Sequence, residues 1–154
     1  MRIDSEIIIS DTSCLILLSK IGSLELLNQI SSKVYITPEI KTEFGKDLPD
    51  WIRIKKAQNK KYQEILEMDL DVGESSAIAL SLDIDNAILI LDDLKGRKIA
   101  DTLNLRYSGT FGLILKAKRL GVVETVKPIL DKIKQTNFRF DEKLFQIVLK
   151  EAKE

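Results

Sequence analysis

Two short apolar runs that end abruptly at acidic residues constrain the fold of this chain most strongly. Residues 7–9 are three consecutive isoleucines and are followed by Asp11, and residues 87–91 are followed directly by Asp92-Asp93. Short runs of this kind, rich in β-branched residues, are typical of strands that are buried on both faces of a parallel sheet. We therefore predict strands at 6–10 and 87–91, each with acids at its carboxyl end.

Segments with helical spacing or helix-capping residues separate these strands from one another. The full prediction is a strand at 6–10, helices at 14–20 and 24–30, a strand at 34–36, a helix at 39–44, an edge strand or extended connector at 51–55, helices at 60–68 and 74–82, a strand at 87–91, a helix at 95–103, a short strand at 105–107, and helices at 112–120, 126–134 and 141–152. Such alternation predicts an α/β sandwich around a mainly parallel sheet.

The composition excludes several kinds of chemistry. The 154 residues suit one domain, and 24 Lys+Arg balance 24 Asp+Glu, so any basic surface must be local. The chain has no His, which removes Ser-His-Asp catalysis and the commonest transition-metal ligand. A single cysteine, Cys14, excludes internal disulfides and cysteine-based zinc sites. Oxygen ligands remain, and these suit Mg²⁺ or Mn²⁺.

The sequence also gives an expectation of location. Residues 1–6 carry acids where a secretory signal requires a basic and then an apolar run. No stretch approaches the roughly 20 apolar residues of a membrane span. The single thiol suits a reducing compartment. We expect a cytoplasmic protein with no membrane association.

The acids after the two strands form a candidate site. Ligands of parallel α/β sheets bind outside the carboxyl ends of the strands, which is where Asp11 and Asp92-Asp93 fall. Glu43 and Glu74 could face the same edge. Carboxylates that lie close together repel each other unless a cation sits between them, and a Mg²⁺ site would resolve that conflict.

Each of these acids also has a purely structural interpretation. Asp11 could only cap a helix, and one of Asp92 and Asp93 is expected to cap the next helix. Glu74 could complement the dipole of a helix in its first turn. Glu43 could be a solvated residue on a helix face. These alternatives remain open from local sequence alone.

Two hydroxyls and several cations allow the same two interpretations. Ser13 and Thr110 could order a metal-bound water or simply satisfy backbone groups. Four basic residues are candidates for binding a phosphate, although charged helix faces are usually just solvated; they are Arg97, Lys98, Lys116 and Lys118.

Five segments taken together and in order resemble the PIN-domain ribonucleases, which include the VapC toxins of toxin–antitoxin pairs. The segments are Ile-Ile-Ser-Asp-Thr-Ser at 8–13, Ile-Thr-Pro-Glu-Ile-Lys-Thr-Glu at 36–43, Leu-Asp-Val-Gly-Glu-Ser-Ser-Ala-Ile at 70–78, Leu-Asp-Asp-Leu-Lys-Gly-Arg-Lys-Ile-Ala at 91–100, and Tyr-Ser-Gly-Thr-Phe-Gly at 107–112, followed by Lys-Ala-Lys at 116–118 and Gly121. The segments at 70–78 and 91–100 are similar to a VapC-like prokaryotic subgroup. The likeness covers about residues 5–122.

The resemblance implies a three-layer α/β/α fold, frequent dimers, and metal-dependent cleavage of RNA. Carried onto this chain, the catalytic acids are Asp11, Glu43, Glu74 and Asp93, with Asp92 as an adjacent metal ligand or a cap. The third position is commonly Asp in the toxins, and Glu74 reaches one methylene further. We expect one domain, 1–154, in which 123–154 form a helical C-terminal extension.

These observations lead to one main hypothesis and two rivals. The main hypothesis is a Mg²⁺- or Mn²⁺-dependent endoribonuclease, in which the four cations named above are candidates for binding the phosphates of RNA. The resemblance adds the expectation of a homodimer and, if the chain is a toxin, of an antitoxin partner. The first rival is a catalytically silent PIN-like module that binds RNA or protein. The second, a phosphoacceptor or phosphatase, lacks the Asp-x-Asp motif after the first strand. Trp51 is either a core residue or an exposed anchor for the partner.

Overall fold

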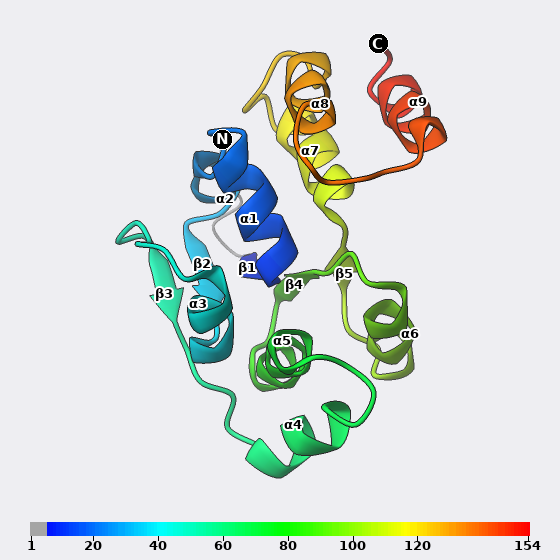
Figure 1. Ribbon diagram of the computed structural model, residues 1–154. Coiled ribbons are helices and arrows are strands. Elements are labelled where there is room, and N and C mark those ends of the chain that lie inside the picture. The colour runs from blue at the N-terminus through cyan, green and yellow to red at the C-terminus, as the bar shows by residue number, and fades with distance from the viewer. Residues whose placement is uncertain (1–5) are drawn as a thin grey trace.

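The computed structural model describes residues 6–154, which fold around a five-stranded parallel sheet (Figure 1). The strands are β1 (Ile7–Ser10), β2 (Lys33–Ile36), β3 (Ile52–Ile54), β4 (Ala87–Ile90) and β5 (Tyr107–Ser108). Their order is β3-β2-β1-β4-β5, and every neighbouring pair is parallel. The predicted parallel sheet is confirmed, and the segment at 51–55 is an edge strand. The interpretation of the N-terminal segment concerns residues 1–6, of which 1–5 lie outside the described part.

Helices cover both faces of the sheet and give the three-layer α/β/α arrangement. In Figure 1, α4, α5 and α6 lie on one side of β1 and β4, and α2, α7 and α8 lie on the other. The helices are α1 (Thr12–Lys20), α2 (Glu25–Ile30), α3 (Pro38–Phe44), α4 (Lys60–Leu66), α5 (Val72–Asp83), α6 (Leu94–Thr102), α7 (Thr110–Arg119), α8 (Lys127–Lys134) and α9 (Glu142–Glu151). No helix in residues 6–154 is long and apolar enough to cross a bilayer.

The central strands are buried on both faces, as their continuous apolar sequence predicts. Ile8 and Ile9 of β1 and Leu89 and Ile90 of β4 are almost fully buried. Helix α5 contacts both strands, and its small buried residues Ser75, Ser76, Ala77 and Ala79 allow this close approach. Burial of these apolar groups is the main force that holds the sheet edge and its acids in place.

Several element boundaries differ from the sequence prediction. Helix α5 begins two residues early, at Val72, because the side chain of Asp71 caps it. Strand β5 begins at Tyr107, because the left-handed Asn104 closes a turn in which Leu105 N–H donates to the Ala100 carbonyl (2.9 Å). Trp51 is half-buried and packs against the core.

The C-terminal segment packs on α7 through aromatic side chains. Phe111 of α7 meets Phe140 and Phe145 edge to face, with ring centroids 4.8 and 5.5 Å apart. Glu154 accepts hydrogen bonds from Lys118 Nζ and from the Val126 N–H, each at 2.8 Å. The expected helical C-terminus is therefore present as α8 and α9.

Candidate metal and catalytic site

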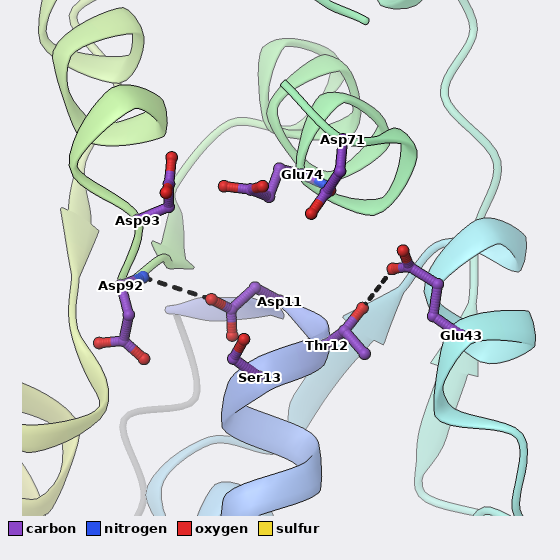
Figure 2. A pocket seen from close by; sticks show the side chains of 8 residues that line it. All are labelled: Asp11, Thr12, Ser13, Glu43, Asp71, Glu74, Asp92 and Asp93. Atoms are coloured by element: carbon purple, nitrogen blue, oxygen red, sulfur yellow. Dashed lines mark hydrogen bonds between the residues drawn. The ribbon is translucent and has the colours of Figure 1, made fainter. Parts of the chain in front are cut away.

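The carboxyl ends of β1 and β4 open into an acidic cavity of about 490 Å³ (Figure 2). The two strands pair in parallel with Ser10 opposite Ile90, so the residues that follow them emerge side by side. Six of the eight lining residues are acids, and the other two carry hydroxyls. They are Asp11, Thr12, Ser13, Glu43, Asp71, Glu74, Asp92 and Asp93. All five acids predicted from the sequence line this one cavity.

Asp11 lies deepest and also caps a helix. Its Oδ1 accepts a hydrogen bond from the Cys14 N–H (2.9 Å) at the start of α1, and its Oδ2 accepts one from the Asp92 N–H (3.3 Å). Only 4% of Asp11 is exposed. Burial, together with the charge of Asp92, raises its pKa to about 7. The two interpretations of Asp11 are therefore compatible, because one carboxylate both caps α1 and faces the cavity.

Glu74 carries a buried oxygen that has no partner. Its Oε2 is inaccessible to solvent and accepts no hydrogen bond within the described residues. Burial, with Asp71 and Asp93 close by, raises the pKa of Glu74 to about 9. An unsatisfied buried carboxylate oxygen is costly, and a bound cation would remove that cost.

Asp71 is an acid of the cavity that sequence reasoning missed. Its Oδ1 accepts a hydrogen bond from the Glu74 N–H (2.8 Å), so it caps α5. The spacing Asp71-x-x-Glu74 is that of a capping box, which could have located this helix start. That signal indicates a cap, whereas the exposure of Asp71 to the cavity depends on the tertiary fold.

Glu43 reaches the cavity from α3 and is held there by Thr12. The Thr12 hydroxyl donates to Glu43 Oε1 at 2.6 Å, across 31 residues of sequence (Figure 2). Glu43 is thus more than a solvated residue on a helix face. Thr12 was not predicted as a site residue, although it stands beside Asp11 in the same segment as Ser13, which also lines the cavity.

Asp92 and Asp93 have different surroundings. Asp93 caps α6 by accepting from the Gly96 N–H (2.8 Å), and Figure 2 shows its side chain on the side of Glu74. Asp92 accepts from both the N–H (2.9 Å) and the hydroxyl (2.6 Å) of Thr110. Thr110 is fully buried and does not line the cavity, and it is connected to the lining by its hydrogen bonds to Asp92.

None of the four predicted RNA-binding cations lines the cavity. Lys116 pairs with Glu6, which precedes β1 and so lies at the opposite end of the sheet from Asp11. Lys118 pairs with Glu154 near the C-terminus, and Arg97 lies against Asp92. Lys98 is exposed on α6. Their role in RNA binding stays a prediction.

The oxygen atoms that line the cavity are of the kind that binds a divalent ion. Carboxylate and hydroxyl oxygens are hard ligands that suit Mg²⁺ or Mn²⁺. Within residues 6–154, no three acids converge closely enough to hold one ion together in this conformation. The carboxylates instead surround the cavity. The unpartnered Glu74 oxygen and the raised pKa values of Asp11 and Glu74 indicate a site that gains by taking up a cation.

Comparison with known proteins gives one match. A family model described as a PIN domain matches residues 7–154. No curated protein and no solved structure matches this chain. The matched range includes β1 and all six acids of the cavity and extends through α9.

Proposed function

The chain belongs to the PIN-domain family, and we propose that it is a Mg²⁺- or Mn²⁺-dependent endoribonuclease that hydrolyses RNA phosphodiester bonds. PIN domains are in general nucleases that bind nucleic acids and use divalent metal ions. The observation that carries the proposal is the convergence of six acids from four segments on one cavity, at the sheet edge where ligands of such folds bind.

The proposed catalytic acids are those that the family resemblance assigned. Asp11, Glu43, Glu74 and Asp93 would hold the ion, and a bound ion would supply the Lewis acidity that activates a water and stabilises charge on the scissile phosphate. The chain itself orients these ligands. The Thr12 hydroxyl fixes Glu43, and the N–H groups of Cys14 and Asp92 fix Asp11.

Protonation links metal binding to pH in this site. Without a cation, Glu74 with its pKa of about 9 keeps a proton at neutral pH, and Asp11 with its pKa of about 7 is partly protonated. Binding of a divalent ion requires both groups to release those protons. We therefore expect activity to rise with pH through the neutral range.

A VapC-like toxin role is the finer part of the proposal. The motifs at 70–78 and 91–100 support it, since they resemble a VapC-like subgroup. The proposed partners are an antitoxin protein and a second copy of the chain. Sedimentation at micromolar concentration that shows only a 17.5 kDa species would contradict the dimer.

The proposal is tested by cleavage of a mixed pool of structured RNAs with Mg²⁺, Mn²⁺ or EDTA. The parent protein is compared with Asp11→Asn and Asp93→Asn, which remove one cavity charge each. Asp85→Asn is the matched control, because this exposed acid lies before β4, at the other end of the sheet. We expect metal-dependent cleavage by the parent and by Asp85→Asn only. Cleavage by none of the proteins, with RNA binding retained, would favour the silent binding module.

A further inference from the structure

The carboxylate of Asp92 forms hydrogen bonds with the start of α7, on the side away from the other acids of the cavity. Thr110 donates to both of its oxygens, from the backbone N–H to Oδ1 (2.9 Å) and from the hydroxyl to Oδ2 (2.6 Å). Figure 2 shows this side chain directed away from Glu74 and Asp93. Asp92 thus lines the cavity, but its charged end faces the start of α7.

Arg97 closes the other side of this carboxylate. Its Nη2 lies 3.7 Å from Asp92 Oδ1, and its Nε donates to the Leu91 carbonyl at 2.7 Å. Its guanidinium carbon lies 5.6 Å from the centre of the Tyr107 ring, within cation–π range. Arg97 therefore contacts the end of β4, the acid that follows it and strand β5.

Gly109 shows how closely the chain packs around the pair. A Cβ at this position would lie 2.2 Å from Arg97 Nη2 and 2.8 Å from Asp92 Oδ1. The backbone before α7 thus approaches both charged groups at a distance that only glycine permits. Three segments, the end of β4, helix α6 and the start of α7, meet at one ion pair.

The same turn supplies two groups to the cavity. The backbone N–H of Asp92 donates to Asp11 Oδ2 (3.3 Å), and the next residue, Asp93, caps α6 and faces Glu74. Any rotation of the turn after β4 would move both groups. Fixing the Asp92 side chain therefore fixes the positions of Asp11 and Asp93 relative to each other.

We propose that Asp92, Arg97 and Thr110 form a positioning cluster, which binds neither metal nor RNA but holds the β4–α6 turn so that Asp93 serves as the metal ligand. This proposal rests on the proposed nuclease function. It assigns different roles to two adjacent acids that local sequence left equivalent. It also assigns Arg97, a candidate phosphate contact by sequence, to a contact with protein groups.

The test compares variants of the cluster with a variant of the proposed ligand. Asp92→Asn, Arg97→Gln and Thr110→Val are each expected to lower kcat for RNA cleavage about tenfold, as for other groups that orient metal ligands. KM for RNA should not change. Arg97→Lys should recover part of kcat, and the double variant Asp92→Asn/Arg97→Gln should be no slower than either single variant. Lys95→Gln, at an exposed position of the same helix, is the control for lost charge.

Calorimetric titration with Mn²⁺ separates positioning from ligation. Asp93→Asn should lose the heat of binding, whereas Asp92→Asn should keep binding and match Arg97→Gln. Loss of Mn²⁺ binding in Asp92→Asn but not in Arg97→Gln would overturn the proposal, because Asp92 would then be a ligand. A rise in KM for Arg97→Gln at constant kcat would also overturn it, because Arg97 would then contact RNA.

Failure of the nuclease function itself is recognised separately. In that case the parent protein neither cleaves RNA nor binds Mn²⁺. Urea unfolding of the Asp92→Asn and Arg97→Gln single and double variants then tests whether these residues stabilise the turn together. Non-additive losses of stability support the cluster, and additive losses overturn it.

Discussion

Glu43 occupies the space where the side chain of residue 73 would begin. A Cβ added at Gly73 would lie 1.9 Å from Glu43 Oε1 and 2.9 Å from its carboxyl carbon. Helices α3 and α5, which lie far apart in sequence, thus bring the Glu43 carboxylate against the backbone of Gly73 at the cavity. Glycine is required here for space and not for its backbone conformation, because a Cβ would collide with Glu43 whereas its φ lies outside the left-handed region.

We expect Gly73→Ala to abolish RNA cleavage while changing stability little. The colliding atoms are the far end of a flexible side chain, so Glu43 can swing away and loses mainly the Thr12 hydrogen bond, worth about 1 kcal/mol. Alanine is the better helix former by about 1 kcal/mol, which offsets part of that loss. Cleavage assays and urea unfolding check both parts.

The double variant Gly73→Ala/Glu43→Gln provides the control for this prediction. If Gly73→Ala acts by displacing Glu43, the double variant should cleave no more slowly than Glu43→Gln alone. Full activity of Gly73→Ala would show that the position of Glu43 in the cavity does not matter for cleavage.

We expect the free energy of unfolding, measured in EDTA, to fall as the pH rises from about 4 to about 7. The folded state raises the pKa of Asp11 from 3.8 to about 7, so in this range it binds more protons than the unfolded state. A shift of this size corresponds to at most about 4 kcal/mol. Urea unfolding at several pH values checks the sign. Stability that rises over this range would contradict the prediction.

Glu74→Gln isolates the part of the pH dependence of the unfolding free energy that lies above pH 7. The pKa of Glu74 rises from 4.5 to about 9, so its contribution to stability is still being lost between pH 7 and 9. The glutamine variant should be more stable than the parent at pH 9 and similar to it at pH 5. Glu124→Gln, at an exposed position, is the control and should leave the pH profile unchanged.

We expect Mn²⁺ to stabilise the protein more at pH 8 than at pH 5. The ion competes with protons for Asp11 and Glu74, and at pH 5 both carboxyl groups are protonated in the absence of the ion, which weakens its binding. At an ion concentration one hundred times Kd the gain is about 2.7 kcal/mol. Thermal unfolding in MnCl₂, against KCl of equal ionic strength, measures it. An equal shift at both pH values, or an unreduced shift in Asp93→Asn, would contradict binding at these acids.

The sequence predicted those features that depend on local pattern and sheet topology. Apolar runs located β1 and β4, and parallel pairing brought Asp11 beside Asp92 and Asp93 across about eighty residues. Glu43 and Glu74 were candidates for the same edge from the sequence, and the family likeness assigned them as catalytic acids. Local pattern could not show whether a helix cap also faces a cavity, and so Asp71 was missed.

Long-range pairing of charges was the other feature that sequence could not show. Arg97, Lys116 and Lys118 look like solvated or phosphate-binding cations when only their neighbours are known. In the structure they contact Asp92, Glu6 and Glu154 respectively. The pairs of Lys116 and Lys118 join residues 110 and 36 positions apart, so they depend on how the chain returns to the same place, which no motif encodes. Asp92 is a near neighbour of Arg97 in sequence, but the turn after β4 that brings them together is set by the fold.

We expect Lys116→Met to lower stability and to leave RNA binding unchanged. Glu6 is buried, and Lys116 is its less exposed partner, with 16% of its side chain accessible against 59% for Arg106. Without Lys116, the buried Glu6 carboxylate keeps only the exposed Arg106 as its partner. We expect this to lower the free energy of unfolding by about 3 kcal/mol. Glu6→Gln should recover much of this loss in the double variant, because it removes the buried charge. Urea unfolding measures both effects, and Arg106→Met, which breaks the exposed pair, should cost less. A Lys116→Met protein of unchanged stability that binds RNA more weakly would instead establish Lys116 as a phosphate contact and place RNA at the amino end of the sheet.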